Sequence, residues 1–169
     1  KVIVVSSAMS GVTNELIKKS FEISDSFSDS EHDVLVSTGE QVSCSLIAGR
    51  LIHEGYESRS WLSWQIPILT KGKYKNSRIN QINKGNIIKY LKKGGIPVIT
   101  GFQGLNDENR ITTIGRGGSD ASAIMIAKFF KAERCIIYTD VEGVYTTDPN
   151  KLKNAKKIKV ISYEEMLEM

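Results

Sequence analysis

The sequence is poor in cysteine, histidine and proline, and it contains no long hydrophobic run. Two cysteines, Cys44 and Cys135, among 169 residues cannot build a disulfide framework, and no cluster of cysteine and histidine has zinc-binding spacing. The longest apolar runs, such as Val2–Val5 and Cys135–Tyr138, are far too short to cross a bilayer. These absences exclude a disulfide-stapled miniprotein, a zinc finger and a transmembrane protein.

The remaining composition is that of an ordinary globular domain. Hydrophobic residues make up 40% and charged residues 25% of the chain, and the formal net charge is +4. No secretory leader is visible, and the use of cysteine favours a reduced, cytoplasmic setting. Lys1 leads straight into a strand-like run, and Tyr163–Met169 has the pattern of a helix start. We therefore expect a domain fragment, cut at both ends, over residues 1–169.

Apolar patterning predicts strands that alternate with helices. The strands are expected at Lys1–Ser7, Ser58–Ser63, Ile96–Thr100 and Arg134–Thr139. The helices are expected after Asn14, over Glu40–Glu54, over Ile82–Leu91 and over Ser119–Lys131. Strands alternating with helices predict an α/β fold with a mainly parallel sheet covered by helices.

Three polar stretches are interpreted as connections. Ser24–Asp33 is rich in serine and aspartate and is expected to be an exposed loop or short linker. Lys71–Ser77 is expected to be a basic, exposed turn. Gly101–Gly115 is expected to be a hairpin-like excursion with a polar tip at Asn106–Asn109.

Four polar segments that contain glycine are expected at the carboxyl ends of the strands, where open α/β sheets bind ligands. Because the carboxyl ends of parallel strands share one edge of the sheet, these segments could form one site. They are Ser7–Asn14, Ser37–Glu40, Gly115–Asp120 and Thr139–Asp148.

Gly115–Asp120 (GRGGSD) is the most informative of these segments. Glycines before a helix let the backbone approach a ligand, and the helix start presents free N–H groups. Arg116 offers a fork for a carboxylate or phosphate, and Asp120 could bind an amine. The plainer reading is a turn in which Ser119 caps the helix and Asp120 favours its dipole.

The other segments have equally plain alternatives. Thr13 could line a ligand site or simply cap a helix, and Glu40 could meet a ligand ammonium or simply favour a helix dipole. Asp140 could bind ribose or orient a metal, and Tyr145 could contact a nucleotide, or both belong to a turn. No Walker A or GxGxxG motif occurs. The isolated His32 and His53 are expected at the surface.

Taken together and in order, the segments resemble the aspartate kinase family, within the amino acid kinase fold. The matching stretches are VVSSAMSGVTN (Val4–Asn14), STGEQVS (Ser37–Ser43), TTIGRGGSDASA (Thr112–Ala123) and YTDVEGVYTTDP (Tyr138–Pro149). The resemblance implies a three-layer α/β/α sandwich. It also implies transfer of the γ-phosphoryl group of ATP, with Mg²⁺, to the side-chain carboxylate of L-aspartate, the first step towards lysine, threonine and methionine.

The resemblance also implies roles for single residues. Thr13, Glu40, Arg116 and Asp120 would form the aspartate site, in which Arg116 holds a carboxylate and Glu40 or Asp120 faces the ammonium group. Thr139, Asp140 and Tyr145 would contact the nucleotide. Asn150 stands where members often have arginine, so neighbouring Lys151 is expected to contact the nucleotide instead. No protein metal ligand is expected.

Departures from the family pattern keep other readings open. The KFGGTS-type segment, the Gly-Ala-Lys segment and the regulatory ACT domains are not found, so this chain alone is expected to be poorly active. The full-length protein is expected to be a homo-oligomer.

The alternatives are a kinase of the same fold acting on glutamate, acetylglutamate, carbamate or uridylate, and a non-catalytic ligand-sensing module. A nucleic-acid-binding domain would rest only on the basic runs Lys71–Lys75 and Lys151–Lys159, which usually form solvated faces. No nucleic-acid or membrane partner is therefore expected.

Overall fold

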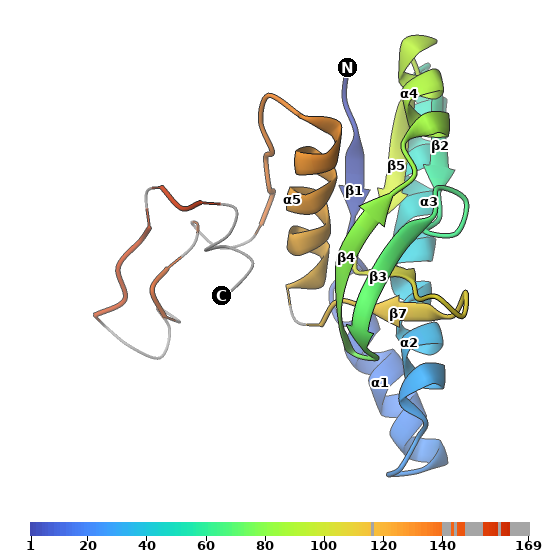
Figure 1. Ribbon diagram of the computed structural model, residues 1–169, viewed down its shortest axis with the longest axis vertical. Helices are drawn as coiled ribbons and strands as arrows, with labels where there is room; N and C mark the ends of the chain where they lie inside the picture. Colours follow the sequence, from blue (N-terminus) through green and yellow to red (C-terminus); the bar gives the residue numbers. More distant parts are fainter. Residues whose placement is uncertain (116, 140–142, 144, 148–153, 159, 163–169) are drawn as a thin grey trace. The chain divides into compact units, whose positions relative to one another are not determined.

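The computed structural model describes residues 1–115, 117–139, 143, 145–147, 154–158 and 160–162. The chain divides into two compact units, Lys1–Glu133 and Arg134–Met169 (Figure 1). The strands of the first unit are β1 (Val4–Ser6), β2 (Ser58–Trp61), β3 (Ile68–Lys73), β4 (Asn76–Ile82), β5 (Ile96–Thr100), β6 (Gln103–Leu105) and β7 (Ile111–Thr113). Its helices are α1 (Val12–Ile23), α2 (Asp29–Val36), α3 (Thr38–His53), α4 (Gly85–Lys92) and α5 (Gly118–Phe130).

The strands of the first unit form two sheets. One has three parallel strands in the order β1-β5-β2, with Ser6 opposite Thr100 and Trp61 opposite Ile99. The other has four strands in the order β4-β3-β6-β7, and only its β3–β6 pair is parallel. The prediction of a parallel sheet is therefore confirmed for the first sheet, whereas the sequence analysis did not predict the second.

Helices cover both faces of the parallel sheet, which is the three-layer arrangement expected from the sequence. Cys44 and Ala48 of α3 pack with Val98 on one face. On the other face Ile99 and Trp61 join a larger core to which the two sheets, α4 and α5 all contribute. Adjacent residues of β5 thus point to opposite layers, as the alternation of side chains along a strand requires.

Several element predictions are confirmed, and others are wrong. The helices expected over Glu40–Glu54 and Ser119–Lys131 correspond to α3 and α5, and the hairpin with its tip at Asn106–Asn109 corresponds to β6 and β7. The helix expected over Ile82–Leu91 begins only at Gly85, because Ile82 pairs with Ile68 in the β4–β3 ladder.

The segment Ser24–Asp33 is not simply an exposed loop, because its second half begins α2. Asp33 is wholly buried, and its carboxylate accepts hydrogen bonds from distant parts of the chain. His32 was expected at the surface, yet only 14% of its side chain is exposed. His53 is exposed, as predicted. The basic turn expected over Lys71–Ser77 has exposed lysines but is shorter than predicted, because Lys71–Lys73 belong to β3 and Asn76–Ser77 to β4, and Ser77 is buried.

The second unit contains no strand at Arg134–Thr139, where one was expected. Its described residues include one isolated antiparallel bridge, Tyr145 with Lys157, supported by a Thr146 N–H bond of 3.0 Å to the Lys156 carbonyl. A strand requires a neighbour for its backbone groups, and apolar composition alone does not supply one. The helix start expected at Tyr163–Met169 lies outside the described residues.

Candidate functional site

The carboxyl ends of β1 and β5 meet the starts of two helices. Ser6 ends β1, and the N–H group of Gly101, just after β5, donates a hydrogen bond of 3.0 Å to the Ser6 carbonyl. A Cβ atom added to Gly101 would lie 3.1 Å from the Cα atom of Ser119, at the start of α5. Only a glycine allows this approach, which brings the start of α5 against the strand ends.

The start of α3 reaches the same edge from the other layer. A Cβ atom added to Gly39 would lie 2.9 Å from the Cβ atom of Ala8, in the loop after β1. The Ser43 hydroxyl donates hydrogen bonds to the carbonyls of Ser7 (2.6 Å) and Glu40 (3.1 Å). These contacts fix the first turn of α3 on the loop that leads into α1. We call the segments Ser7–Thr13, Thr38–Glu40, Thr100–Gly101 and Gly117–Asp120 the acceptor rim.

Glu40 is the most unusual side chain of the acceptor rim. It is only 2% exposed. Its Oε1 atom accepts a hydrogen bond of 3.0 Å from the Ala8 N–H group, whereas its buried Oε2 atom has no hydrogen-bond partner in the structure. Burial raises the pKa of this carboxyl group to about 7, and the Ala8 N–H bond opposes that shift only in part.

A second buried polar atom of the acceptor rim also lacks a partner. The hydroxyl of Thr100, the last residue of β5, is buried and makes no hydrogen bond in the structure. Buried polar groups are nearly always hydrogen-bonded, so an unpartnered one needs an explanation, of which a bound ligand or water is one. His32 Nδ1 and Trp61 Nε1 are also buried without a hydrogen-bond partner, but they lie outside the acceptor rim. Glu40 Oε2 and Thr100 Oγ1 both belong to neighbours of Ser6. The Ser6 hydroxyl donates a hydrogen bond to the Glu40 carbonyl, and Ser6 lies opposite Thr100 in the β1–β5 ladder.

Two further predicted residues lie on the acceptor rim. Thr13 is half-buried in the first turn of α1. Asp120 is half-buried in the first turn of α5, and burial raises the pKa of its carboxyl group. The predicted acceptor-site residues Thr13, Glu40 and Asp120 therefore come from the starts of α1, α3 and α5, all next to the ends of β1 and β5.

The other predicted site residues either lie outside the described residues or belong to the second unit. Arg116, Asp140 and Lys151 lie outside the described residues. Thr139 and Tyr145 belong to the second unit, in which Thr139 is exposed and Tyr145 takes part in the bridge to Lys157.

The sequence analysis missed Thr100 and Ser43 as site residues. Thr100 lies directly before Gly101 at the end of a confirmed strand, and this position was the signal that could have identified it. Ser43 belongs to the STGEQVS stretch, but its role in holding α3 depends on Ser7, 36 residues earlier in the chain. No local pattern reveals such a contact.

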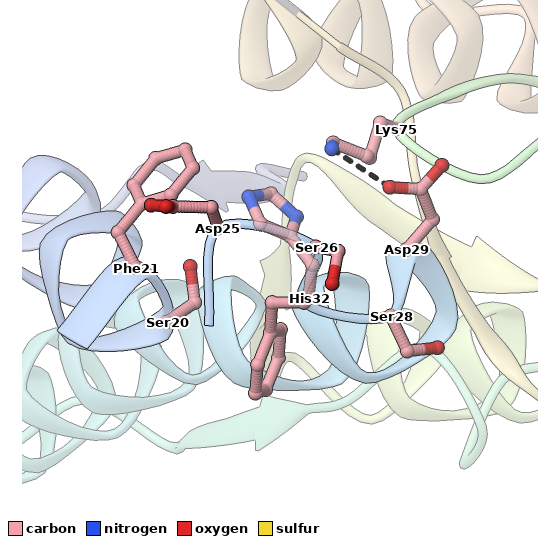
Figure 2. A pocket seen from close by; sticks show the side chains of 9 residues that line it. Ser20, Phe21, Asp25, Ser26, Ser28, Asp29, His32 and Lys75 are labelled. Atoms are coloured by element: carbon pink, nitrogen blue, oxygen red, sulfur yellow. Dashed lines mark hydrogen bonds and ion pairs between the residues drawn. The ribbon is translucent and has the colours of Figure 1, made fainter. Parts of the chain in front are cut away.

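A separate cavity of about 440 Å³ lies between the end of α1 and the start of α2 (Figure 2). It contains none of the predicted site residues. Its polar lining includes the exposed Asp29–Lys75 ion pair, with 2.8 Å between Oδ1 and Nζ. Asp29 has a lowered pKa, chiefly because Lys75 donates a hydrogen bond to it. This cavity carries no part of the acceptor rim.

Neither a metal cluster nor a membrane-spanning helix is found in the part of the chain that the structure describes. No three His, Cys, Asp or Glu side chains of these residues gather closely enough to hold a metal ion. None of the described helices is both long and apolar enough to span a membrane.

The fold and the acceptor rim are those of an α/β/α protein with a candidate ligand site at the carboxyl ends of parallel strands. The profile of the amino acid kinase family matches residues 1–169, and the chain belongs to that family. The family expected from the motifs is therefore confirmed.

The chain is similar to curated and structurally characterised aspartokinases. It is 49% identical over 172 residues to an aspartokinase of Rickettsia conorii, covering 100% of this chain and 43% of that protein. Aspartokinase III of E. coli, solved with aspartate and ADP, shares 25% identity with a TM-score of 0.78, over 93% of this chain and 46% of that one. An aspartate kinase from Synechocystis shares 39% identity with a TM-score of 0.70, over 91% and 25% respectively. The chain thus spans less than half the length of these proteins.

Proposed function

We propose that the protein carrying this chain is an aspartate kinase, which transfers the γ-phosphoryl group of ATP to the side-chain carboxylate of L-aspartate. The observation that carries the proposal is the buried Glu40 carboxylate, whose Oε2 atom is unpartnered where β1, α3 and the loop after β1 meet. The 49% identity to a curated aspartokinase supports the choice of aspartate as acceptor.

The acceptor rim would supply the contacts that orient aspartate. The Glu40 carboxylate would accept a hydrogen bond from the substrate ammonium, and a cation beside it would favour the ionised form of this high-pKa group. Thr13 and Asp120 would line the same space, and Arg116 would hold a substrate carboxylate through a bidentate fork. The Thr100 hydroxyl is a further group that can bond to aspartate or to an ordered water.

The nucleotide would be bound by the second unit of the chain. Thr139, Asp140, Tyr145 and Lys151 are proposed for this role, on the resemblance of their segment to the family motif. Mg²⁺ usually enters such sites with the phosphates and takes only one or two protein carboxylates. When bound, Mg²⁺ would neutralise charge on the phosphates.

The reaction requires positioning more than acid–base chemistry. The aspartate side chain is already ionised near neutral pH, so no residue needs to remove a proton from it. One carboxylate oxygen attacks the γ-phosphorus, the bond from that phosphorus to the bridging oxygen breaks, and ADP leaves with the electron pair. The protein must therefore bring two anions into line and offset their repulsion, which is the task proposed for the cationic groups.

We expect the enzyme to act in the cytoplasm as a homo-oligomer and to serve amino-acid biosynthesis, as the aspartate kinase family does. A panel of acceptors tests the substrate. Purified protein containing this chain is assayed for ADP release with aspartate, glutamate, acetylglutamate, carbamate and uridylate. Aspartate should be strongly preferred, and Arg116→Ala should lose that activity. Preference for another acceptor, or no turnover with any of them, would contradict the proposal.

A further inference from the structure

Asp33 is a buried acidic residue that the proposed reaction does not use. It lies in α2, outside the acceptor rim, and its relative exposure is 0%. Its Oδ2 atom accepts hydrogen bonds from the N–H groups of Lys75 (2.9 Å) and Thr113 (2.8 Å), and its Oδ1 atom accepts one from the Thr113 hydroxyl (2.8 Å). A buried carboxylate is tolerated where donors satisfy both of its oxygens, as they do here.

The donors belong to two segments that converge on the glycine-rich loop. Lys75 lies in the turn between β3 and β4, and Thr113 is the last residue of β7. Gly115 has a positive φ of 87°, and a Cβ atom added there would lie 3.0 Å from the Lys75 carbonyl oxygen. Asp33 therefore holds the hairpin turn and the end of β7 together just before Arg116 in the chain.

The far end of that loop is tied to the start of α5. The Gly118 N–H group donates a hydrogen bond of 3.0 Å to the Gly115 carbonyl. Gly118 packs beside the Phe102 ring, and the Phe102 N–H group donates a bond of 2.9 Å to the Ser122 hydroxyl. A shift of Gly115 would therefore be passed on to the first turn of α5, which carries Asp120.

Asp33 is also linked to the helix that carries Glu40. α2 is followed at once by Ser37 and then by α3. The Ser37 carbonyl accepts a hydrogen bond of 2.9 Å from the buried Gln103 side chain. Asp33 thus joins two segments that lie next to the acceptor rim in the chain. The α2–α3 segment leads into Thr38–Glu40, and β7, with the hairpin turn held against it, precedes Gly117–Asp120.

We propose that Asp33 is a positioning residue of the acceptor site, which sets the spacing between Glu40 on α3 and the Gly115–Asp120 segment. The inference rests on the proposed function, because it assigns the two segments to one substrate. Asp33 touches no substrate itself and acts through the backbones of Lys75 and Thr113. Small displacements of substrate-holding groups are costly to catalysis, so the geometry of this support bears directly on acceptor binding.

The test compares KM values for the two substrates in the protein that contains this chain. Asp33→Asn keeps the side-chain shape but turns an amide NH₂ group towards N–H and O–H donors. The KM for aspartate should rise roughly tenfold or more, while the KM for ATP changes by less than about twofold. Thr113→Val removes only the hydroxyl donor and should shift the same KM in the same direction by a smaller factor.

A matched control isolates the carboxylate from its surroundings. Lys75→Ala removes the exposed ion pair with Asp29 (Figure 2) but keeps the backbone N–H that Asp33 accepts, so both KM values should stay unchanged. Ile87→Val lowers stability in the core at α4, away from the acceptor rim, and should change neither KM. A purely structural role of Asp33 would lower the amount of active enzyme and leave both KM values as in the wild type.

The outcomes separate the two proposals. The positioning role alone is overturned if the wild type is active and Asp33→Asn leaves the KM for aspartate unchanged. It is also overturned if Asp33→Asn raises the KM values for aspartate and ATP equally. If Asp33→Asn does not fold, Thr113→Val decides in the same way. A folded wild type that transfers no phosphoryl group to aspartate overturns the proposed function and the positioning role with it.

Discussion

Asp33 and Glu40 are buried carboxylates on consecutive helices, and they differ in how fully hydrogen bonds satisfy their oxygens. Both oxygens of Asp33 accept hydrogen bonds from distant backbone or hydroxyl groups. Glu40 receives one N–H bond on Oε1, and its Oε2 atom has no partner. Hydrogen bonds within the fold satisfy both oxygens of Asp33, whereas one oxygen of Glu40, on the acceptor rim, has no hydrogen-bond donor. The contrast distinguishes the residue that we propose holds the site together from the residue that we propose binds the ligand.

The largest expected effect is on stability, at Asp33. Asp33→Ala leaves the buried Thr113 N–H and hydroxyl groups without a hydrogen-bond acceptor and removes the link to the hairpin turn. The free energy of unfolding should fall by about 3–5 kcal/mol, as measured by urea denaturation. Glu40→Ala should cost clearly less, because it leaves only the Ala8 N–H group unpaired. Equal losses in the two variants would remove the contrast.

The next effect is the pH dependence of stability that Glu40 confers. The pKa of Glu40 is about 7 in the folded chain, against an ordinary value of 4.5, so between these pH values the folded protein keeps a proton that the unfolded chain releases. The free energy of unfolding should therefore be highest below about pH 4.5 and should fall as the pH rises to about 7. The fall should be at most about 3–4 kcal/mol, since the two pKa values differ by about 2.5 and one pKa unit corresponds to ~1.4 kcal/mol.

Glu40→Gln provides the control for that measurement. The amide does not titrate, so the wild type and the variant should differ in the slope of stability against pH between about 4.5 and 7. Parallel curves for the two proteins would mean that the carboxyl group is not held in its neutral form by burial.

A smaller effect is expected on acceptor binding. Glu40→Gln replaces a charge-assisted hydrogen bond to the substrate ammonium by a neutral one, so the Kd for aspartate should rise about tenfold above pH 7. Nucleotide binding should be unchanged, which calorimetry with ADP checks. A loss of both affinities would indicate a general disturbance of the fold instead.

The smallest effect is expected at the exposed ion pair of the hairpin turn. Lys75→Ala breaks the contact with Asp29, in which the two side chains are 46% and 60% exposed. Surface ion pairs contribute about 0–1 kcal/mol and less at high salt, so the urea midpoint should hardly move. A loss as large as that of Asp33→Ala would show that the side chain, rather than the backbone, of Lys75 holds the turn.

The same contrast shows what the sequence could predict. The rim helices α3 and α5 were predicted because their apolar residues recur at helical spacing next to glycine-bearing turns, and Glu40 and Asp120 were chosen with them. Asp33 was missed because a serine- and aspartate-rich segment has the composition of a loop. Its hydrogen-bond donors lie 42 and 80 residues later in the chain. Tertiary pairing, not local pattern, decides its burial.

The remaining misses have the same physical origin. Ile82 continues an apolar helical pattern, but its backbone pairs across the β3–β4 hairpin, so the helix starts later. Arg134–Thr139 has a strand-like composition but forms no strand, because a strand depends on a partner that a local pattern cannot specify. The order of the motifs nevertheless indicated the family, because the four matching segments come from most of the length of the chain.

The most direct test of the account is calorimetric binding of L-aspartate, with L-glutamate as control and Mg-ADP present, from about pH 6 to about pH 8. The account predicts selective binding of aspartate that tightens as the pH rises through about 7, because Glu40 must ionise to pair with the ammonium group. The same titration with Glu40→Gln should show weak binding and no such pH dependence. Equal aspartate affinity in the wild type and Glu40→Gln at every pH would contradict the central role of the unpartnered Glu40 oxygen.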